Sequence, residues 1–278
     1  MALSSTKTRQ RNTFLTANPI LRRLNNVDES GQTEVCTYKG IAIKTALYML
    51  ITFGGGVLYF LLQDSLKTGT PFEITFRGFP VKMYTGQLIG LIACLVLAIF
   101  FQLLANFVRS STPVTGALYC ATQGYFIGFL IMVLGPDYQY LGVLALLITL
   151  FIIIVMAFLY IKRIIRVTEK FKSVVKILAI TMVCISLFIT ITYLIPVTSS
   201  MVSGIVHNYA ISIASSIIFI IIASLFLLSD FDTIEHAVEG NLPKKYEWQA
   251  AFGLAFAVLW IYIKVLELLM KIVGRSKK

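Results

Sequence analysis

The stretch from Ala210 to Lys271 decides the fold, and it reads AISIASSIIFIIIASLFLLSDFDTIEHAVEGNLPKKYEWQAAFGLAFAVLWIYIKVLELLMK. It begins with an apolar run of about 20 residues, the length that crosses a bilayer as a helix. This run leads directly into an acidic cluster, and no Gly or Pro interrupts it before Gly240. A second apolar run follows a short polar connector. The stretch therefore predicts two spanning helices joined at an acidic turn.

The composition places the rest of the chain in a membrane as well. Of its 278 residues, 58% are hydrophobic and 13% are charged, whereas a soluble domain is about 45–50% apolar and about 25% charged. The net charge is +11. The basic residues flank apolar segments, where they set topology and contact anionic lipid. We therefore expect lipid and not nucleic acid as their partner.

The apolar segments predict an all-α integral membrane protein with seven transmembrane helices. The expected spans are residues 40–62, 85–107, 114–134, 140–161, 174–195, 210–229 and 248–272. This division gives a basic N-terminal segment (1–38), a transmembrane domain (39–273) and a basic tail (274–278). In the loop 63–84 the sequence FEITF suggests a short strand-like turn. The basic spacing over 162–176 suggests that the fourth helix continues past the membrane surface.

The distribution of Lys and Arg predicts the orientation. With the N-terminus in the cytoplasm, the basic patch at 162–176 and the pair Lys244-Lys245 also face the cytoplasm. A seventh span then places the basic tail outside, which opposes the same rule. Either the tail crosses the membrane, or the last segment does not cross fully. We expect seven spans.

The acidic cluster after the sixth span holds the first candidate site. If the sixth helix continues to Gly240, then Asp232, Glu235, His236 and Glu239 share one face. Asp230 and Asp232 adjoin the apolar run, and acids at membrane depth are candidates for ion pathways. His236 is a possible pH-sensitive group. The simpler interpretation is a solvated helix end.

The last apolar segment holds the second candidate site. Lys264 and Glu267 lie one turn apart and well inside this segment, where a charge is costly unless it faces the bundle interior. The simple interpretation is a local ion pair. The alternative is an interhelical contact, for which Asp232 is the obvious partner of Lys264.

No catalytic constellation is present in the sequence. It contains no HExxH, GxSxG, Walker or dinucleotide-binding pattern at a plausible place. The four cysteines are widely spaced without a CxxC motif, which is typical of apolar filling and not of metal binding. We therefore expect neither an enzyme nor a bound cofactor.

The chain resembles the Bax inhibitor-1 (TMBIM) family, in its bacterial YccA-like branch. The matching segments are SDFDTIE, EWQAAFGL and the final LWIYIKVLELL, together with NPILRRL and YKGIAIKTALY near the start. The resemblance implies seven helices with the last one central in the bundle. It also implies a bacterial inner-membrane protein that conducts calcium in a pH-sensitive way, gated by one acid from the sixth helix and one from the seventh.

The gating residues are carried over from this resemblance. Asp232 is the first choice on the sixth helix, and Asp230 is the second. On the seventh helix the expected acid falls at Lys264, so this chain departs from the family pattern, and Glu267 follows one turn later. Either an Asp232–Lys264 pair replaces the shared proton, or Glu267 takes over. Asp232 and Glu267 would then hold the calcium ion as oxygen ligands.

Two further functions remain open. The first is a non-conducting membrane protein that binds and modulates a membrane protease, with the segments 1–38 and 162–176 as contact surfaces. The second is a cation-coupled transporter, which predicts inverted repeats. We find no such repeats.

Overall fold

The computed structural model describes residues 34–76, 79–194 and 208–275. Most of the predicted N-terminal segment (1–38) and the end of the basic tail (274–278) lie outside these residues, as does the last residue of the fifth predicted span. The chain separates into two units, Met1–Val35 and Cys36–Lys278. All the helices described below belong to the second unit.

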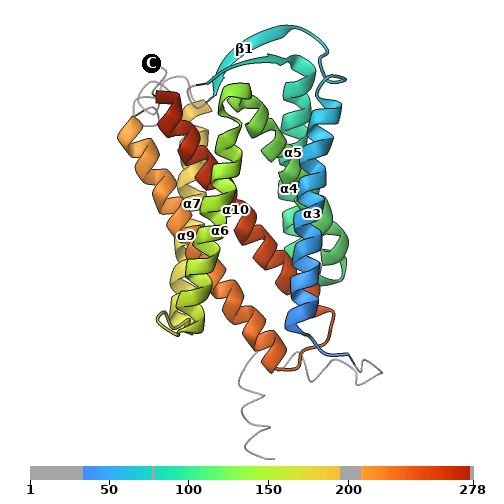
Figure 1. The fold of residues 1–278 in the computed structure, drawn as a ribbon, viewed down its shortest axis with the longest axis vertical. Coiled ribbons are helices and arrows are strands. Elements are labelled where there is room, and N and C mark those ends of the chain that lie inside the picture. The colour runs from blue at the N-terminus through green and yellow to red at the C-terminus, as the bar shows by residue number, and fades with distance from the viewer. Residues whose placement is uncertain (1–33, 77–78, 195–207, 276–278) are drawn as a thin grey trace, which may run out of the picture. The chain divides into compact units, whose positions relative to one another are not determined.

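Seven long helices and one β-hairpin form the described part of this unit (Figure 1). The helices are α3 (Tyr38–Leu62), α4 (Thr85–Phe107), α5 (Thr112–Leu134), α6 (Tyr140–Ile161), α7 (Glu169–Leu194), α9 (Tyr209–Glu239) and α10 (Tyr246–Arg275). The hairpin strands are β1 (Pro71–Phe76) and β2 (Phe79–Tyr84), and short 3₁₀ turns, Arg109–Ser111 and Pro136–Tyr138, precede α5 and α6.

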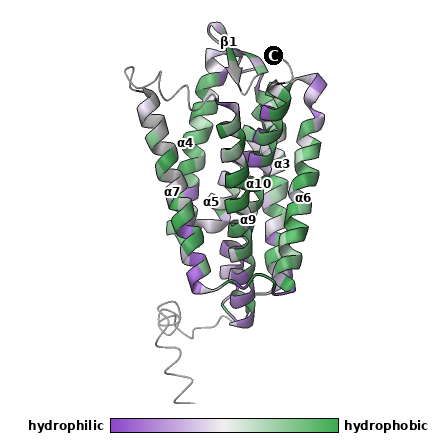
Figure 2. Cartoon of the chain, turned by 90° about the vertical axis from the view of Figure 1, so that its left-hand side faces the viewer, coloured by the Kyte–Doolittle hydropathy of each residue, from purple (hydrophilic) through white to green (hydrophobic). Residues whose placement is uncertain are grey.

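Six stretches of this chain are long and apolar enough to cross a membrane. They run from 23 to 31 residues and contain α3, α4, α5, α6, α9 and α10. At about 1.5 Å per residue they exceed the hydrocarbon thickness of about 30 Å. In Figure 2 their middles are apolar, and polar residues gather toward the helix ends. The protein is therefore a multi-pass helical membrane protein. The fifth predicted span, 174–195, falls almost entirely within α7.

Close packing of α3 against α5 explains one glycine in each helix, Gly55 and Gly124. A Cβ at Gly55 would overlap the Ala121 carbonyl oxygen of α5, and a Cβ at Gly124 would overlap the Thr52 carbonyl oxygen of α3. Only glycine allows backbones to approach this closely. The helix α3 continues through the Gly54–Gly56 run without a break. Within this run Gly55 serves packing, whereas a Cβ at Gly54 would meet no neighbouring atom.

The last helix, α10, has the most buried apolar window of the six. Within the structure 56% of this window is buried, against 17–44% in the others. It contacts α3, α5, α6 and α9. Small and branched side chains allow these contacts, among them Ala251, Ala255 and Ile261, which are all inaccessible to solvent.

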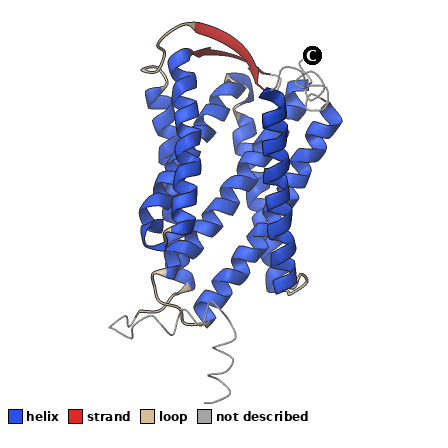
Figure 3. Ribbon diagram, turned by 180° about the vertical axis from the view of Figure 1, so that it is seen from behind, coloured by secondary structure: helices blue, strands red, loops and turns tan. Residues whose placement is uncertain are grey.

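The hairpin covers the end of the bundle where α10 finishes (Figure 3). The strands pair antiparallel, with Phe72 opposite Met83 and Phe76 opposite Phe79. Phe79, Val81 and Met83 alternate with exposed residues and are buried against the main core. The FEITF segment predicted as strand-like therefore lies in a true strand, β1.

The sequence predicted that the fourth and the sixth helix both continue beyond their apolar runs, and only the second of these predictions is correct. The sixth predicted helix continues as expected, because α9 ends at Glu239. The predicted extension of the fourth helix beyond the membrane is wrong, because α6 ends at Ile161. There Arg163 adopts a left-handed backbone with φ of 52°, and the Ile164 amide bonds back to the Leu159 carbonyl. This hydrogen-bonding pattern ends a helix, and the chain turns into α7.

Candidate functional site

The acidic face of α9 lines a polar pocket next to the end of α6. Asp232, Glu235, His236 and Glu239 all contribute to a cavity of about 450 Å³, whose other walls come from the end of α6 and the loop after it. The predicted sharing of one helix face is thus confirmed. We call this end of the bundle, where α6 and α9 finish and α3 and α10 begin, the basic end.

Asp232 forms an ion pair with a helix that the sequence did not suggest. Its side chain is 9% exposed, and its Oδ2 lies 2.5 Å from the Nζ of Lys172 on α7. The ammonium and the carboxylate are therefore in direct contact across the interface of α7 and α9. The Lys172 ammonium also lies 3.5 Å from Glu169. Asp232 thereby links α9 to α7.

His236 stands beside this ion pair, one turn along α9. Its Nδ1 lies 3.3 Å from the Asp232 Oδ2 and 2.8 Å from the Asp232 carbonyl oxygen. The imidazole is 72% exposed, so it is in contact with solvent. A charge on His236 would add a second cation next to the Asp232 carboxylate.

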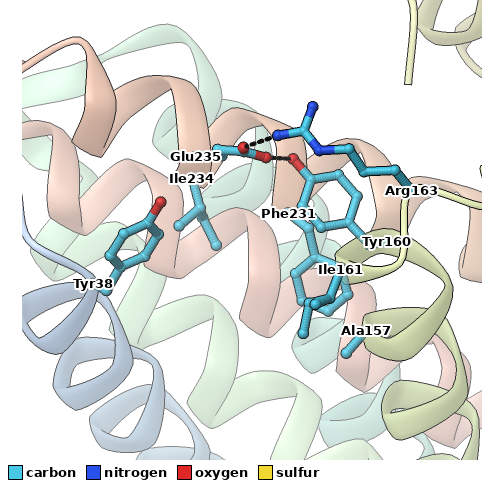
Figure 4. Close-up of a pocket in the computed structure, with 8 residues that line it drawn as sticks. All are labelled: Tyr38, Ala157, Tyr160, Ile161, Arg163, Phe231, Ile234 and Glu235. Atoms are coloured by element: carbon cyan, nitrogen blue, oxygen red, sulfur yellow. Dashed lines mark hydrogen bonds and ion pairs between the residues drawn. The ribbon is translucent and has the colours of Figure 1, made fainter. Parts of the chain in front are cut away.

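Glu235 is held by the end of α6. The Tyr160 hydroxyl donates to its Oε2, and the Nη2 of Arg163 donates to its Oε1 at 3.1 Å. Figure 4 shows both contacts converging on this carboxylate. The basic charge of this region was visible in the sequence, but the pairing depends on how α6, α7 and α9 pack.

Asp230 points away from these contacts. Two residues on a helix are about 200° apart, so Asp230 faces α10 while Asp232 faces α7. Its Oδ1 lies next to Gly253 of α10. A Cβ added to Gly253 would stand 3.3 Å from this oxygen. Across the residues that the structure describes, its carboxylate forms no ion pair. The α10 residue opposite Asp230 is thus a glycine and not an acid.

Lys264 and Glu267 lie in the opposite half of α10. They pair with each other at 3.2 Å, as the simple interpretation predicted, and the Lys264 ammonium stands 5.1 Å from the centre of the Phe219 ring on α9. Phe219 precedes Asp232 by 13 residues on α9, about 20 Å along the helix axis.

The predicted contact between Asp232 and Lys264 is therefore wrong, and Glu267 does not face Asp232 either. The reason is the antiparallel direction of α9 and α10, which places the end of α9 against the beginning of α10. A calcium site shared by Asp232 and Glu267 does not form in this structure. Within the described ranges no three His, Cys, Asp or Glu side chains converge as a metal site.

A further buried carboxylate at the basic end was missed by the sequence analysis. The Glu247 side chain is 1% exposed and pairs with Lys44 of α3. It also accepts hydrogen bonds from the Thr37 amide at 2.9 Å and the Thr37 hydroxyl at 3.0 Å. These contacts join the first turn of α10 to the beginning of α3. No sequence signal distinguishes Glu247 from a solvated residue in a helix's first turn.

The helices and the acidic site define a multi-pass helical membrane protein with charged pairs between its helices at one end. Comparison with protein families then shows the family to which this membrane protein belongs. The family model described as "Bax inhibitor 1 like" matches residues 15–274, so the chain belongs to the Bax inhibitor-1 family. Searches of curated proteins and of solved structures found no match to this chain.

Proposed function

We propose that this protein is a pH-modulated calcium leak of a bacterial cell membrane, held closed by the ion pair between Asp232 and Lys172. In this proposal all seven long helices cross the membrane, α10 lies at the centre, and the basic end faces the cytoplasm. The observation that carries the proposal is the buried carboxylate of Asp232 on α9, paired with an ammonium on a neighbouring helix.

The pair is suited to a latch because it joins two helices through a single charged contact. A proton on Asp232 cancels the attraction to Lys172 and removes what holds α7 to α9 at this point. Breaking a buried pair costs several kcal/mol when one charge is left without a partner, about 3–5 kcal/mol in soluble proteins. Proton uptake at this site would therefore shift the two helices apart.

The acids of the α9 face supply the oxygen ligands that a calcium ion prefers. Once the latch opens, Asp232, Glu235 and Glu239 line one pocket and can pass the ion along the helix end. Asp230, which faces Gly253 on the other side of α9, provides a fourth carboxylate on this helix.

The ion path does not follow the far half of the seam between α9 and α10. There Lys264 and Lys271 face α9 with Glu267 between them. The Lys271 ammonium donates to the Ser212 carbonyl at 3.0 Å and to the Ser216 hydroxyl at 2.6 Å. Two ammonium groups against one carboxylate repel a divalent cation in a medium of low dielectric constant.

Calcium entry into proteoliposomes tests the proposal. Purified protein is reconstituted with an internal calcium dye, and the initial rate of entry is measured as the external pH is varied. We expect Lys172→Gln to increase the rate at neutral pH, because it removes the latch and leaves the acidic pocket intact. Asp232→Asn should flatten the pH dependence.

Lys170→Gln is the matched control, since Lys170 is an exposed lysine on the same helix. It should leave the rate unchanged. Rates no higher than in empty liposomes, for the wild type and for Lys172→Gln alike, would refute conduction. Flux with an unchanged response in both latch variants would refute only the assignment of the site.

A second candidate function is a non-conducting membrane protein that modulates a membrane protease or another partner. The observation in its favour is a set of exposed basic side chains at the basic end: Lys162, Arg163, Arg166, Lys170 and Lys176. Crosslinking in membranes followed by affinity purification tests this function. A specific partner that is lost on neutralising these residues, with no flux in liposomes, would favour it over the leak.

A further inference from the structure

A second cavity at the basic end lies between α3, α6 and α9 and has a different character. Its volume is about 450 Å³. Ala157 and Ile161 of α6 and Phe231 and Ile234 of α9 form apolar walls, and Tyr38 of α3 closes one side (Figure 4). We call this cavity the α6–α9 pocket.

The position of the α6–α9 pocket matches the boundary between hydrocarbon and lipid headgroups. The apolar run of α6 ends at Ile161, which is 75% exposed, and Arg163 follows two residues later. The polar groups of Tyr160, Arg163 and Glu235 gather at one end of the pocket and are paired with one another, and the remaining walls are apolar. The walls therefore suit the first carbons of an acyl chain.

Arg163 places a positive charge at the polar end of the pocket. One of its nitrogens binds Glu235, but a guanidinium has five N–H donors, and this side chain is 77% exposed. It can therefore bind a phosphate without releasing Glu235. Lys162 and Arg166 are exposed beside it.

The backbone of Arg163 is an independent sign of a functional position. Its φ of 52° is left-handed, a conformation that glycine or asparagine adopts at the end of a helix at little cost. An arginine there is strained, and such strain is concentrated at functional sites. Because the backbone conformation at position 163 disfavours arginine, we attribute the presence of an arginine there to what its side chain binds.

We propose that the α6–α9 pocket binds an anionic phospholipid, with an acyl chain between α6 and α9 and the phosphate on Arg163. The net charge of the pocket rim indicates an anionic occupant, because Lys162, Arg163 and Arg166 together outweigh the carboxylate of Glu235. The chain's own residues 1–33 contain five basic and two acidic side chains, so they carry the same sign as the rim. The proposal does not depend on ion conduction.

Tryptophan quenching by brominated lipids tests this site. Ile161→Trp places a reporter at the pocket, and Phe107→Trp places one at the last residue of α4, where Phe107 is 82% exposed. The control stands at the end of a spanning helix at the basic end, as the reporter does, so it matches the reporter in depth. The full-length protein is reconstituted in mixtures of brominated phosphatidylglycerol and phosphatidylcholine, and the signal of Trp248 and Trp260 is subtracted.

At Ile161→Trp we expect about a fivefold preference for the anionic lipid, since one basic group near the surface contributes about 1 kcal/mol. At Phe107→Trp we expect little preference. Adding Arg163→Gln to the Ile161→Trp protein should abolish the preference, and Arg163→Lys should retain most of it. An excess of inorganic phosphate should not displace the lipid.

Three results would overturn the proposal. The first is equal preference at the two reporters, and the second is a preference that survives Arg163→Gln. The third is the absence of quenching by either lipid at Ile161→Trp, which would mean that protein fills the pocket. Native mass spectrometry of the wild type and of Arg163→Gln, counting retained anionic lipids, gives a second measurement that needs no reporter.

Discussion

Glu247 has the least exposed charged side chain among the described residues, at 1%. Its carboxylate receives the Lys44 ammonium, the Thr37 amide and the Thr37 hydroxyl. The Lys44 ammonium also lies 5.0 Å from the centre of the Trp248 ring. A buried charge is tolerated only when its partners are complete, so each of these contacts supports the others.

Replacing Glu247 therefore tests the value of this cluster. Glu247→Ala leaves Lys44 without its partner, and we expect a loss of about 3 kcal/mol or more in the free energy of unfolding. Thermal unfolding in detergent, followed by intrinsic fluorescence, measures the change. Lys82→Ala is the control, because it breaks the exposed pair with Glu73 on the hairpin and should cost less than about 1 kcal/mol. Equal effects in the two variants would contradict the prediction.

Cys36 lies just before α3 and is almost fully buried. Burial raises the pKa of its thiol, and the nearby Glu247 carboxylate adds to this effect. A raised pKa leaves less thiolate at a given pH, so alkylation should begin at higher pH in the folded protein than in the unfolded one. Mass spectrometry of the Cys36 peptide after timed iodoacetamide treatment measures this. Identical pH–rate curves for folded and SDS-unfolded protein would show the prediction to be wrong.

At the scale of single elements, two helices end in the same way with different residues. After α6 the left-handed position is Arg163, and after α9 it is Asn241, with φ of 52° and 50°. In both turns an amide bonds back to a carbonyl five residues earlier. Asparagine is a common choice there and arginine is not. The end of α6 therefore carries strain that the end of α9 avoids.

Comparing Arg163→Gly with Arg163→Ala measures this strain. Both variants lose the contact with Glu235, but only glycine relieves the backbone. We expect the glycine variant to be more stable than the alanine variant by about 1 kcal/mol, from the cost of a left-handed conformation. Thermal unfolding of the two proteins gives the difference. At Arg166, whose φ is not positive, the same pair of substitutions should show no advantage for glycine.

At the scale of the whole molecule, the helices alternate in direction. Because seven long helices follow one another in this way, the end of α10 lies opposite the beginning of α3 (Figure 1). Crossing seven times would place the basic residues after Lys271 on the side that Lys and Arg usually avoid. We expect seven crossings in spite of the charge rule, since α10 packs against four other helices.

Reporter fusions test this topology. A phosphatase that is active only outside the cytoplasm should be active when fused after Lys278 and inactive when fused at the turn 240–245. A fluorescent protein that folds only in the cytoplasm should show the reverse. Cytoplasmic signals from both positions would mean that the last helix does not cross the membrane.

Much of the fold could be predicted because it depends on local patterns. Each predicted span falls within or almost within one helix, since an apolar run of about 20 residues has no other way to satisfy its backbone in lipid. The common face of Asp232 and Glu239 also followed from helical periodicity. The end of α6 was missed because a left-handed arginine is rare, so nothing marked Arg163 as a stop.

The amino-acid sequence by itself determined that the protein is a helical membrane protein, where its helices lie and which acids share a face. Only the tertiary structure decided the partners of those acids: Lys172 for Asp232, Arg163 for Glu235 and Gly253 next to Asp230. The physical reason is the distance along the chain over which each interaction acts. Helix formation in lipid follows from neighbouring residues, whereas a charge finds its partner across a helix interface, and the packing of the antiparallel α9 and α10 keeps Lys264 far from Asp232.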